Sequence, residues 1–302
     1  MTDSLKTLQG NCHCGANRYD IQLPEFPALV ICDCTLCFKK AYVWLYDTED
    51  KLKVTRGCAP ETLTKYTSSS GLEHEFCSSC GTGLFGTHAS GAHAGKRGIN
   101  LRALVSGLDK VFVNGKAVMT LNADGKPAPY PGSLSLVEMT SAVQDAGFSF
   151  RGTLPELTVE YPKLYTGSCA CGDVQIALRT KPLNQVEIKE DNCSICIRIG
   201  GVGVYPHKSQ VAIVGKEHTE DYKFGRKFNG SPFCRTCGVF SFGILYGPPA
   251  EMVARLPEAK QEFVRKQLEI QPLNVRILDG VEWDKIDINW SNEGTEGYSL
   301  QD

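Results

Sequence analysis

Cysteines in short clusters are the residues of this chain whose type and spacing could do chemistry. Thirteen of the fourteen cysteines lie in such clusters, and only Cys58 stands alone. Residues 1–6 lack the pattern of a signal peptide, so we expect a cytoplasmic protein whose thiols stay reduced. Clustered cysteines then indicate metal binding more than disulfides, because disulfide frameworks mostly serve small secreted domains.

The clusters occur twice in the same order, which indicates an internal duplication. An offset of 157 residues relates Cys12 and Cys14 to Cys169 and Cys171, and Cys77 and Cys80 to Cys234 and Cys237. An offset of 159 relates Cys34 and Cys37 to Cys193 and Cys196. Two copies of one unit fit a chain of 302 residues. We place the domains at 1–140 and 160–302, with a connector rich in Pro and Gly at 124–132.

Each copy pairs a C-x-C motif with a C-x-x-C motif, which predicts a four-cysteine zinc site. Four thiolates close a tetrahedral zinc site completely, so it has no open position for a substrate. We expect these two sites to stabilise the fold, because the energy of zinc binding becomes folding energy. The predicted ligands are Cys12, Cys14, Cys77 and Cys80 in the first copy, and Cys169, Cys171, Cys234 and Cys237 in the second.

A third cluster in the first copy, Cys32, Cys34 and Cys37, predicts a zinc site of another kind. Three protein ligands and one open position are usual in catalytic zinc sites. The open position could take water or the sulfur of a thiol substrate. In the alternative interpretation, Cys58 or another residue supplies a fourth ligand and the site is structural.

The second copy departs from this pattern, because Asp191 stands where the first cysteine of the cluster is expected. Asp191, Cys193 and Cys196 could still hold zinc, since carboxylates are also zinc ligands. Two thiolates and a carboxylate bind less tightly, so a decayed site is the favoured interpretation. If the protein is an enzyme, the first copy is therefore the better candidate for its active centre.

Short strands dominate the predicted secondary structure, so the fold class is mainly β. Alternation of apolar and polar residues, or enrichment in β-branched and aromatic residues, predicts strands at 17–23, 42–46, 51–55, 173–178, 201–205 and 210–214. The cysteine pairs should lie in tight turns between strands, each followed by a glycine with a positive φ. The second copy carries an insertion around 248–270, in which residues 258–268 predict a short helix.

The charge balance bears on the partners of the chain. Lys plus Arg number 32 and Asp plus Glu number 34, which gives a net charge of −2. No broad basic surface is implied, which argues against nucleic acid and anionic membranes as partners. No run approaches the ~20 apolar residues of a membrane helix. We therefore expect a small-molecule partner, while the oligomeric state stays open.

The ordered motifs resemble those of the glutathione-dependent formaldehyde-activating enzyme and centromere protein V family. The family pattern is G-x-C-x-C-G, then C-H-C-x-x-C, then F-C-x-x-C-G. It aligns with residues 10–15, 32–37 and 76–81, and again with 167–172, 191–196 and 233–238. The resemblance implies β-sheets in a tent-like arrangement, a structural four-cysteine zinc and a three-cysteine zinc for the substrate. The chain departs from the family at Asp33 and Asn192, which replace the usual His, at Asp191, and in the duplication itself.

The resemblance also implies a carbon–sulfur lyase that acts on glutathione or other thiol adducts. The substrate sulfur would bind at the open zinc of Cys32, Cys34 and Cys37. Such a lyase needs a base near the sulfur-bearing carbon. The candidates by residue type are Asp33, which we include among the catalytic residues, and His74, His88 and His93. Arg102 and Lys65 could hold a substrate carboxylate, although such residues are more often solvated.

Two other functions would use the same residues. The first is a non-catalytic zinc module for partner binding or scaffolding, which fits the closed four-cysteine sites and the altered cluster of the second copy. The second is a redox role for the C-x-x-C pairs. The βαβ context expected of thioredoxin-like motifs is absent from the predicted elements, which argues against redox chemistry.

Overall fold

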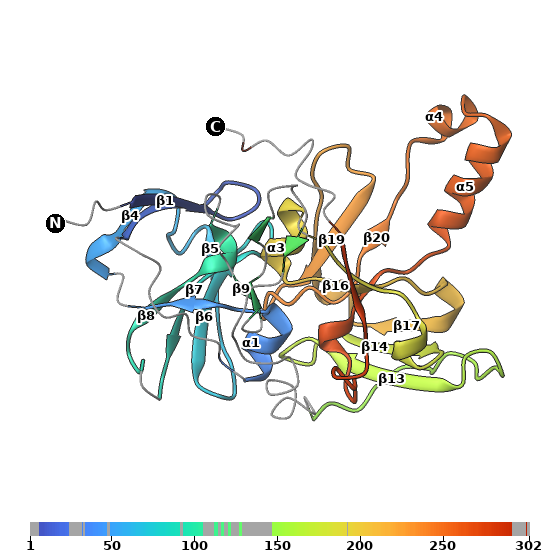
Figure 1. The fold of residues 1–302 in the computed structure, drawn as a ribbon, viewed down its shortest axis with the longest axis horizontal. Helices are drawn as coiled ribbons and strands as arrows, with labels where there is room; N and C mark the ends of the chain where they lie inside the picture. Colours follow the sequence, from blue (N-terminus) through green and yellow to red (C-terminus); the bar gives the residue numbers. More distant parts are fainter. Residues whose placement is uncertain are drawn as a thin grey trace.

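The computed structural model has the predicted mainly β fold, with few and short helices (Figure 1). Among the residues that it describes, no helix is long and apolar enough to cross a membrane. The structure describes residues 6–23, 32, 34–46, 49–90, 93–104, 112–113, 116–117, 120–121, 127–128, 147–191, 193–291 and 300.

Two sheets build the first copy, coloured blue to green in Figure 1. One is three-stranded with the order β1-β2-β4, and the other is five-stranded with the order β3-β8-β7-β6-β5. The strands are β1 (Lys6–Asn11), β2 (Arg18–Leu23), β3 (Trp44–Leu45), β4 (Leu52–Arg56), β5 (Leu63–Thr67), β6 (Leu72–Cys77), β7 (Gly83–His88) and β8 (Arg97–Asn100). Two 3-10 helices accompany them, η1 (Glu49–Lys51) and η2 (Leu101–Ala103).

The second copy repeats this plan but divides the larger sheet. The sheet β13-β14-β17 corresponds to β1-β2-β4, while β18-β19-β20 and β21-β16-β15-β22 are separate sheets. Only an isolated bridge, Phe242 with Leu273, remains where β7 pairs with β8 in the first copy. The strands are β13 (Lys163–Ser168), β14 (Gln175–Thr180), β15 (Ile188–Asp191), β16 (Val202–Val204), β17 (Val211–Val214), β18 (Thr219–Tyr222), β19 (Asn229–Cys234), β20 (Ile244–Leu245), β21 (Leu273–Asn274) and β22 (Ile288–Ser291).

The pairing register shows which residues of the two copies correspond. Trp44 pairs with Asn100 in the first copy, and Gly203 pairs with Asn274 in the second. Both asparagines then cap a 3-10 helix, η2 and η7 (Val275–Ile277), by accepting a hydrogen bond from the backbone two residues later. Gly203 therefore occupies the backbone position of Trp44.

The remaining elements lie outside these sheets. The predicted helix at 258–268 is α5 (Glu258–Leu268), which follows α4 (Ala250–Ala254) and projects from the second copy with no buried residue (Figure 1). Short strand pairs join β9 (Phe112–Val113) to β10 (Lys116–Ala117) and β11 (Thr120–Leu121) to β12 (Pro127–Ala128). The other 3-10 helices are η4 (Leu183–Gln185), η5 (Lys208–Gln210) and η6 (Lys216–His218).

The prediction of tight turns was wrong for one kind of cysteine pair. Cys34 and Cys193 are the N-caps of two six-residue helices, α1 (Thr35–Lys40) and α3 (Ser194–Ile199). A spacing of three residues places both cysteines of a pair on one face of the first turn. The periodicity of such short helices is too brief to be recognised in a sequence.

Helices α1 and α3 also carry reciprocal contacts between the copies. Lys39 Nζ donates a hydrogen bond of 2.7 Å to the carbonyl of Ser168, at the end of β13. Arg198 Nε, at the equivalent place in α3, donates a hydrogen bond of 3.2 Å to the carbonyl of Asn11, at the end of β1. The copies are therefore related by an approximate twofold arrangement within one chain.

The last residues of the two helices lie near the approximate twofold axis. Lys40 is buried, and its Nζ donates to the carbonyl of Gly81 at 2.7 Å and to that of Gly238 at 2.5 Å. Burial lowers the pKa of Lys40 to about 8. A Cβ on Gly200 would lie 2.5 Å from the Cβ of Ala41, so the helix ends leave no room for two methyl groups.

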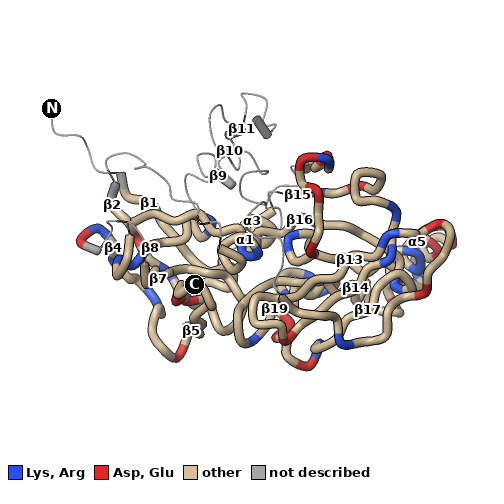
Figure 2. The backbone as a smooth tube through the Cα atoms, turned by 90° about the horizontal axis from the view of Figure 1, so that it is seen from below, with Lys and Arg blue, Asp and Glu red and all other residues tan. Residues whose placement is uncertain are grey.

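The hydrophobic core crosses the boundary between the copies. One buried cluster contains Leu36 and Trp44 of the first copy together with Ile176 and Phe242 of the second. The proposed division into 1–140 and 160–302 therefore describes the repeat in the sequence, and it stays a prediction as a division into domains. Lys and Arg residues are interspersed with Asp and Glu residues along the described parts of both copies, as Figure 2 shows.

Candidate metal centres

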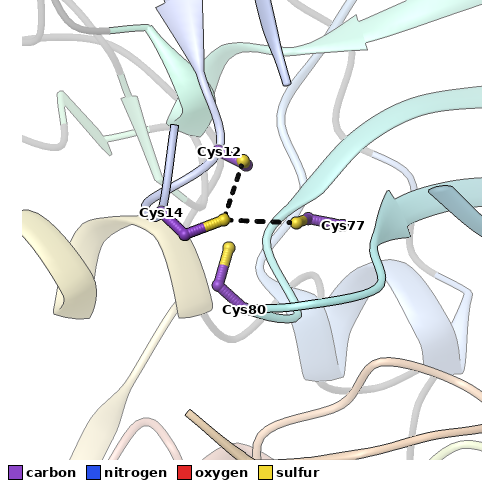
Figure 3. Close-up of side chains that lie close together, drawn as sticks. All are labelled: Cys12, Cys14, Cys77 and Cys80. Carbon is purple, nitrogen blue, oxygen red and sulfur yellow. Dashed lines mark hydrogen bonds between the residues drawn. The ribbon is translucent and has the colours of Figure 1, made fainter. Parts of the chain in front are cut away.

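The four predicted cysteines of the first copy converge on one point (Figure 3). Cys12 and Cys14 lie in the turn between β1 and β2, Cys77 ends β6, and Cys80 lies in the turn before β7. Their sulfur atoms all lie within 4.8 Å of one another, with 3.5 Å between Cys12 and Cys14 and 3.6 Å between Cys14 and Cys77. The structure thus brings together four residues that are far apart in the sequence.

The second copy has the same arrangement. The sulfur atoms of Cys169, Cys171, Cys234 and Cys237 lie within 4.8 Å of one another. Each of the two clusters is followed by glycines in the left-handed region, as expected, with φ of +74° at Gly15 and +82° at Gly172. In both clusters a backbone amide five residues on donates a hydrogen bond to the first sulfur, at 3.2 Å for Cys12 and 3.3 Å for Cys169.

The donor set of these two clusters fits a soft divalent metal. Four buried or half-buried cysteine sulfurs at mutual distances below 4.8 Å match a tetrahedral thiolate site. All fourteen cysteines are free thiols in the structure. The two clusters are therefore consistent with metal binding, and zinc is the metal that four thiolates most often hold.

The third cluster of the first copy lies at the beginning of α1. Cys37 is buried, whereas Cys32 and Cys34 are half-buried. Hydrogen bonds with Cys32 and Cys37 lower the pKa of Cys34 to about 2, and the Ser70 hydroxyl acts in the same direction. Burial raises the pKa of Cys37 above its usual range. Asp33, which we predicted to be catalytic, lies outside the described residues.

His88 is a candidate ligand that the sequence did not single out beyond its residue type. A ring nitrogen of His88, at the end of β7, lies within 4.8 Å of the sulfurs of Cys32 and Cys37, while Cys34 is not part of that mutual set. Its Nε2 is buried and makes no hydrogen bond among the described residues. Burial also lowers the pKa of His88, which favours the neutral imidazole that binds metals.

A comparison of the two copies was the signal that could have found His88. The register of β7 with β6 places His88 opposite Leu72, and β20 places Leu245 opposite Asn229 in the same position. Leucine cannot bind a metal, so only the first copy has a possible metal ligand at this position. Cys58 instead lies beside Asn17 and Arg18, and among the described residues it belongs to none of the groups that could hold a metal.

The structure also brings together the three residues of the third cluster in the second copy. Atoms of Asp191, Cys193 and Cys196 lie within 4.8 Å of one another, and the two sulfurs are 2.8 Å apart. Asp191 accepts hydrogen bonds from the Cys193 amide at 2.5 Å and from the Ser291 hydroxyl at 2.8 Å. These bonds hold the carboxylate beside the thiols, so the structure offers a mixed donor set of one oxygen and two sulfurs.

The other polar residues considered from the sequence have different surroundings. His74 is fully buried, with its Nδ1 2.7 Å from the Tyr42 hydroxyl, and burial holds its pKa well below the usual range. His93 stacks on Tyr46 with ring centroids 4.2 Å apart. Lys65 pairs with Glu73 at the surface.

Arg102 is not the solvated residue that we expected. Its guanidinium is buried and donates to the carbonyls of Ala41 at 2.6 Å and Ile197 at 2.8 Å. Glu190 lies 3.8 Å away, and burial lowers the pKa of Arg102 to about 9. Arg102 therefore joins the first copy to α3 and is not available to hold a substrate.

A pocket of about 280 Å³ lies beside the first copy's cluster, at the boundary with the second copy. We call it the interface pocket. Thr35 at the start of α1, Tyr66 and the serines 68–70 line it on one side. Phe148 and Ala170 line the other side. Because Thr35 and Leu36 line the pocket and lie between Cys34 and Cys37 in the chain, the pocket and the cluster are adjacent.

The chain is similar in sequence to known proteins. The model of a family described as glutathione-dependent formaldehyde-activating enzyme matches residues 7–107 and again 164–257, so it covers more than half of the chain. A solved structure titled as a Rhodobacter sphaeroides protein is 28% identical to this chain. It aligns with 42% of this chain and 99% of its own length, with a TM-score of 0.32.

Proposed function

Because the chain belongs to the glutathione-dependent formaldehyde-activating enzyme family, we propose that it is a zinc-dependent carbon–sulfur lyase acting on glutathione or other thiol adducts. The proposed site is the cluster of Cys32, Cys34 and Cys37 in the first copy. The observation that carries the proposal is that Thr35 and Leu36, which lie between Cys34 and Cys37, line the interface pocket. None of the four-cysteine clusters has a comparable donor set with a position left open.

The donors of the proposed site fit zinc. Soft thiolates and a neutral imidazole are the ligands that zinc prefers, and His88 has a buried nitrogen directed to no other partner among the described residues. Zinc held there would supply a Lewis acid that stabilises the sulfur of the substrate as a thiolate. A set of three cysteines, or of Cys32, Cys37 and His88, leaves one position for that sulfur.

The interface pocket is suited to the polar remainder of such a substrate. The hydroxyls of Ser68, Ser69 and Ser70 can donate hydrogen bonds to the carboxylate and amide groups of a peptide thiol. A pocket of about 280 Å³ admits a small molecule and orients it by a few polar groups. The second copy contributes Ala170, and Phe148 comes from the segment before it, so the proposed substrate site needs both copies.

The reaction proposed for a formaldehyde adduct of a thiol needs a proton acceptor. The C–S bond breaks, the hydroxyl proton passes to the base, the carbonyl forms, and the sulfur leaves with the electron pair as a thiolate. We propose Asp33 as this base from its position in the sequence between Cys32 and Cys34. His74 is buried against Tyr42, and half-buried His93 stacks on Tyr46, so those two histidines are less suitable.

The test is turnover of the glutathione–formaldehyde adduct by the zinc-loaded chain, followed by NMR. We expect Cys34→Ala to lower turnover by at least ~100-fold, because zinc-bound groups contribute several kcal/mol to such reactions. The matched variant Cys193→Ala in the second copy should keep most of the activity. Zinc content and thermal unfolding of both variants control for folding. Wild-type protein that neither binds nor cleaves the adduct would refute the lyase and leave the scaffolding function.

A further inference from the structure

A second cavity, of about 350 Å³, lies in the second copy beside Cys193 and Cys196. We call it the second-copy cavity. It lies where the larger sheet is divided, since residues of β16, β20 and β21 line it. Its walls are mostly apolar and include Val202, Phe240 and Leu245. This cavity takes no part in the proposed function, which uses the first copy.

Three replacements of large residues by small ones account for the cavity. By strand register, Gly203 stands in place of Trp44, and Ser231 stands in place of His74. The shared offset of 159 residues places Gly201 at the position of Tyr42. Removing an indole, a phenol and an imidazole from one region leaves a void unless the surrounding chain collapses. Gly201, Gly203 and Ser231 all line the cavity, so the surrounding chain did not close this space.

The first copy shows what fits into this space. Trp44 is fully buried, its ring lies 4.5 Å from that of Tyr42, and a Cβ on Gly86 would touch it at 2.5 Å. Its indole N–H donates a hydrogen bond of 3.2 Å to the sulfur of Cys37. The equivalent of Gly86 is Gly243 and that of Cys37 is Cys196, and both line the second-copy cavity.

We propose that the second-copy cavity binds a small, neutral, planar aromatic molecule with an N–H group directed at the sulfur of Cys196. The ligand would take the place that the Trp44 side chain occupies in the first copy. Apolar cavities that lack a large side chain bind aromatic molecules of matching size. The aliphatic and aromatic walls favour a flat apolar ring, and the sulfur of Cys196 accepts the single hydrogen bond.

Indole is the probe that tests the proposal, by calorimetric titration of the zinc-loaded chain. We expect saturable binding of one indole per chain. Gly201→Tyr should weaken binding at least tenfold, because it restores the phenol of the first copy (~1.4 kcal/mol per tenfold). A Cβ on Gly201 meets no atom closer than 3.6 Å, so the substitution fits the backbone.

A second filling variant guards against misfolding of the first. Gly203→Trp restores the indole itself, and its Cβ would lie 2.6 Å from the hydroxyl and 2.9 Å from the Cζ of Tyr205, so that side chain, which is 47% exposed, must turn outward. Ser70→Tyr, which narrows the interface pocket of the first copy, is the matched control and should leave indole binding unchanged. Thermal unfolding and zinc content identify any variant that fails to fold.

Three results would overturn the proposal: no saturable indole binding by the wild type, wild-type affinity in a folded Gly201→Tyr or Gly203→Trp variant, or loss of binding in Ser70→Tyr. None of these measurements depends on turnover. The ligand site can therefore stand if the lyase activity is absent, and it can fail while that activity is present.

Discussion

The two copies keep one kind of centre unchanged and differ at the other. The four-cysteine clusters have the same donors and the same turns, and their first two sulfurs are 3.5 Å apart in the first copy and 3.4 Å apart in the second. In the second copy, Asp191 replaces the first cysteine of the third cluster, and Leu245 replaces His88. A site that stabilises folding tolerates little change, because its loss affects the whole chain. The other cluster was free to diverge in one copy.

The difference extends to the space around each third cluster. In the first copy, the buried side chains of Trp44 and Tyr42 fill the space on the side of the cluster away from the interface pocket, and the interface pocket is open. In the second copy, the space equivalent to that of Trp44 and Tyr42 is the second-copy cavity, which is open. Its interface side is filled by His13, which contacts the Tyr222 hydroxyl at 2.7 Å and the Ser194 hydroxyl at 2.9 Å. Each copy thus opens toward a different side, so the copies present two different sites.

Loss of a four-cysteine cluster should have the largest effect and should be equal in the two copies. We expect Cys77→Ala and Cys234→Ala each to lose one zinc and to unfold much of the chain. Zinc binding in small domains contributes about 10–16 kcal/mol, which exceeds the net stability of most proteins. Metal analysis and thermal unfolding measure this. A folded variant with unchanged melting would show that the cluster has no structural role.

Truncation of Trp44 should destabilise the protein, whereas a change at the equivalent position of the second copy should not. Trp44→Ala should lower the free energy of unfolding by about 3–5 kcal/mol, because it opens a cavity in a packed core. The matched change Gly203→Ala should cost less than ~1 kcal/mol, since the Tyr205 ring that its Cβ meets belongs to a side chain that is 47% exposed and can move outward. Urea unfolding compares the two. Equal losses of unfolding free energy in the two variants would contradict a packed site at Trp44 and an open cavity at Gly203.

Removal of the Lys40 ammonium should weaken the contact between the copies. Lys40→Met leaves the buried carbonyls of Gly81 and Gly238 without this donor. We expect a loss of roughly 2–4 kcal/mol in urea unfolding, since an unsatisfied buried polar group costs about 1–3 kcal/mol. Lys39→Met, which removes the donor to the Ser168 carbonyl away from the approximate axis, should cost less. A larger effect for Lys39 would argue against the shared role of Lys40.

Substitutions in the insertion of the second copy should have the smallest effect. Phe263 in α5 is 61% exposed, and no residue of that helix is buried. Phe263→Ser should therefore change the free energy of unfolding by less than ~0.5 kcal/mol, as is usual for surface positions. The same urea measurement applies. A loss above 1 kcal/mol would mean that α5 packs against a partner in solution.

Metal-ligand spacing and repeats made much of the molecule predictable. The offset of 157 residues matched Cys12, Cys14, Cys77 and Cys80 to their counterparts, and the structure assembles both sets. The mainly β fold and the 258–268 helix followed from residue patterns that extend over several residues. These features depend on local sequence or on donors whose chemistry admits few alternatives.

Contacts between distant segments could not be predicted in this way. Nothing near His88 in the sequence shows that β7 ends beside Cys32 and Cys37. Arg102 and His13 are charged or polar residue types that are usually exposed, yet tertiary contacts bury them between the copies. The helices that begin at Cys34 and Cys193 are likewise stabilised by packing across the boundary, which a single sequence does not reveal.

The contacts of Lys40 and Gly200 near the approximate axis have a consequence for how such a molecule can arise. In a dimer of two identical chains, every residue at the axis must meet its own twin. Two copies of Lys40 would then compete, as like charges, for the carbonyls that one Lys40 now bonds, and two copies of Ala41 would collide. Here Lys40 faces the second copy, in which the equivalent residue is Ile199. Likewise, Ala41 faces Gly200. Joining the copies in one polypeptide removes the requirement for self-complementarity, so each half can carry the residue that its twin could not.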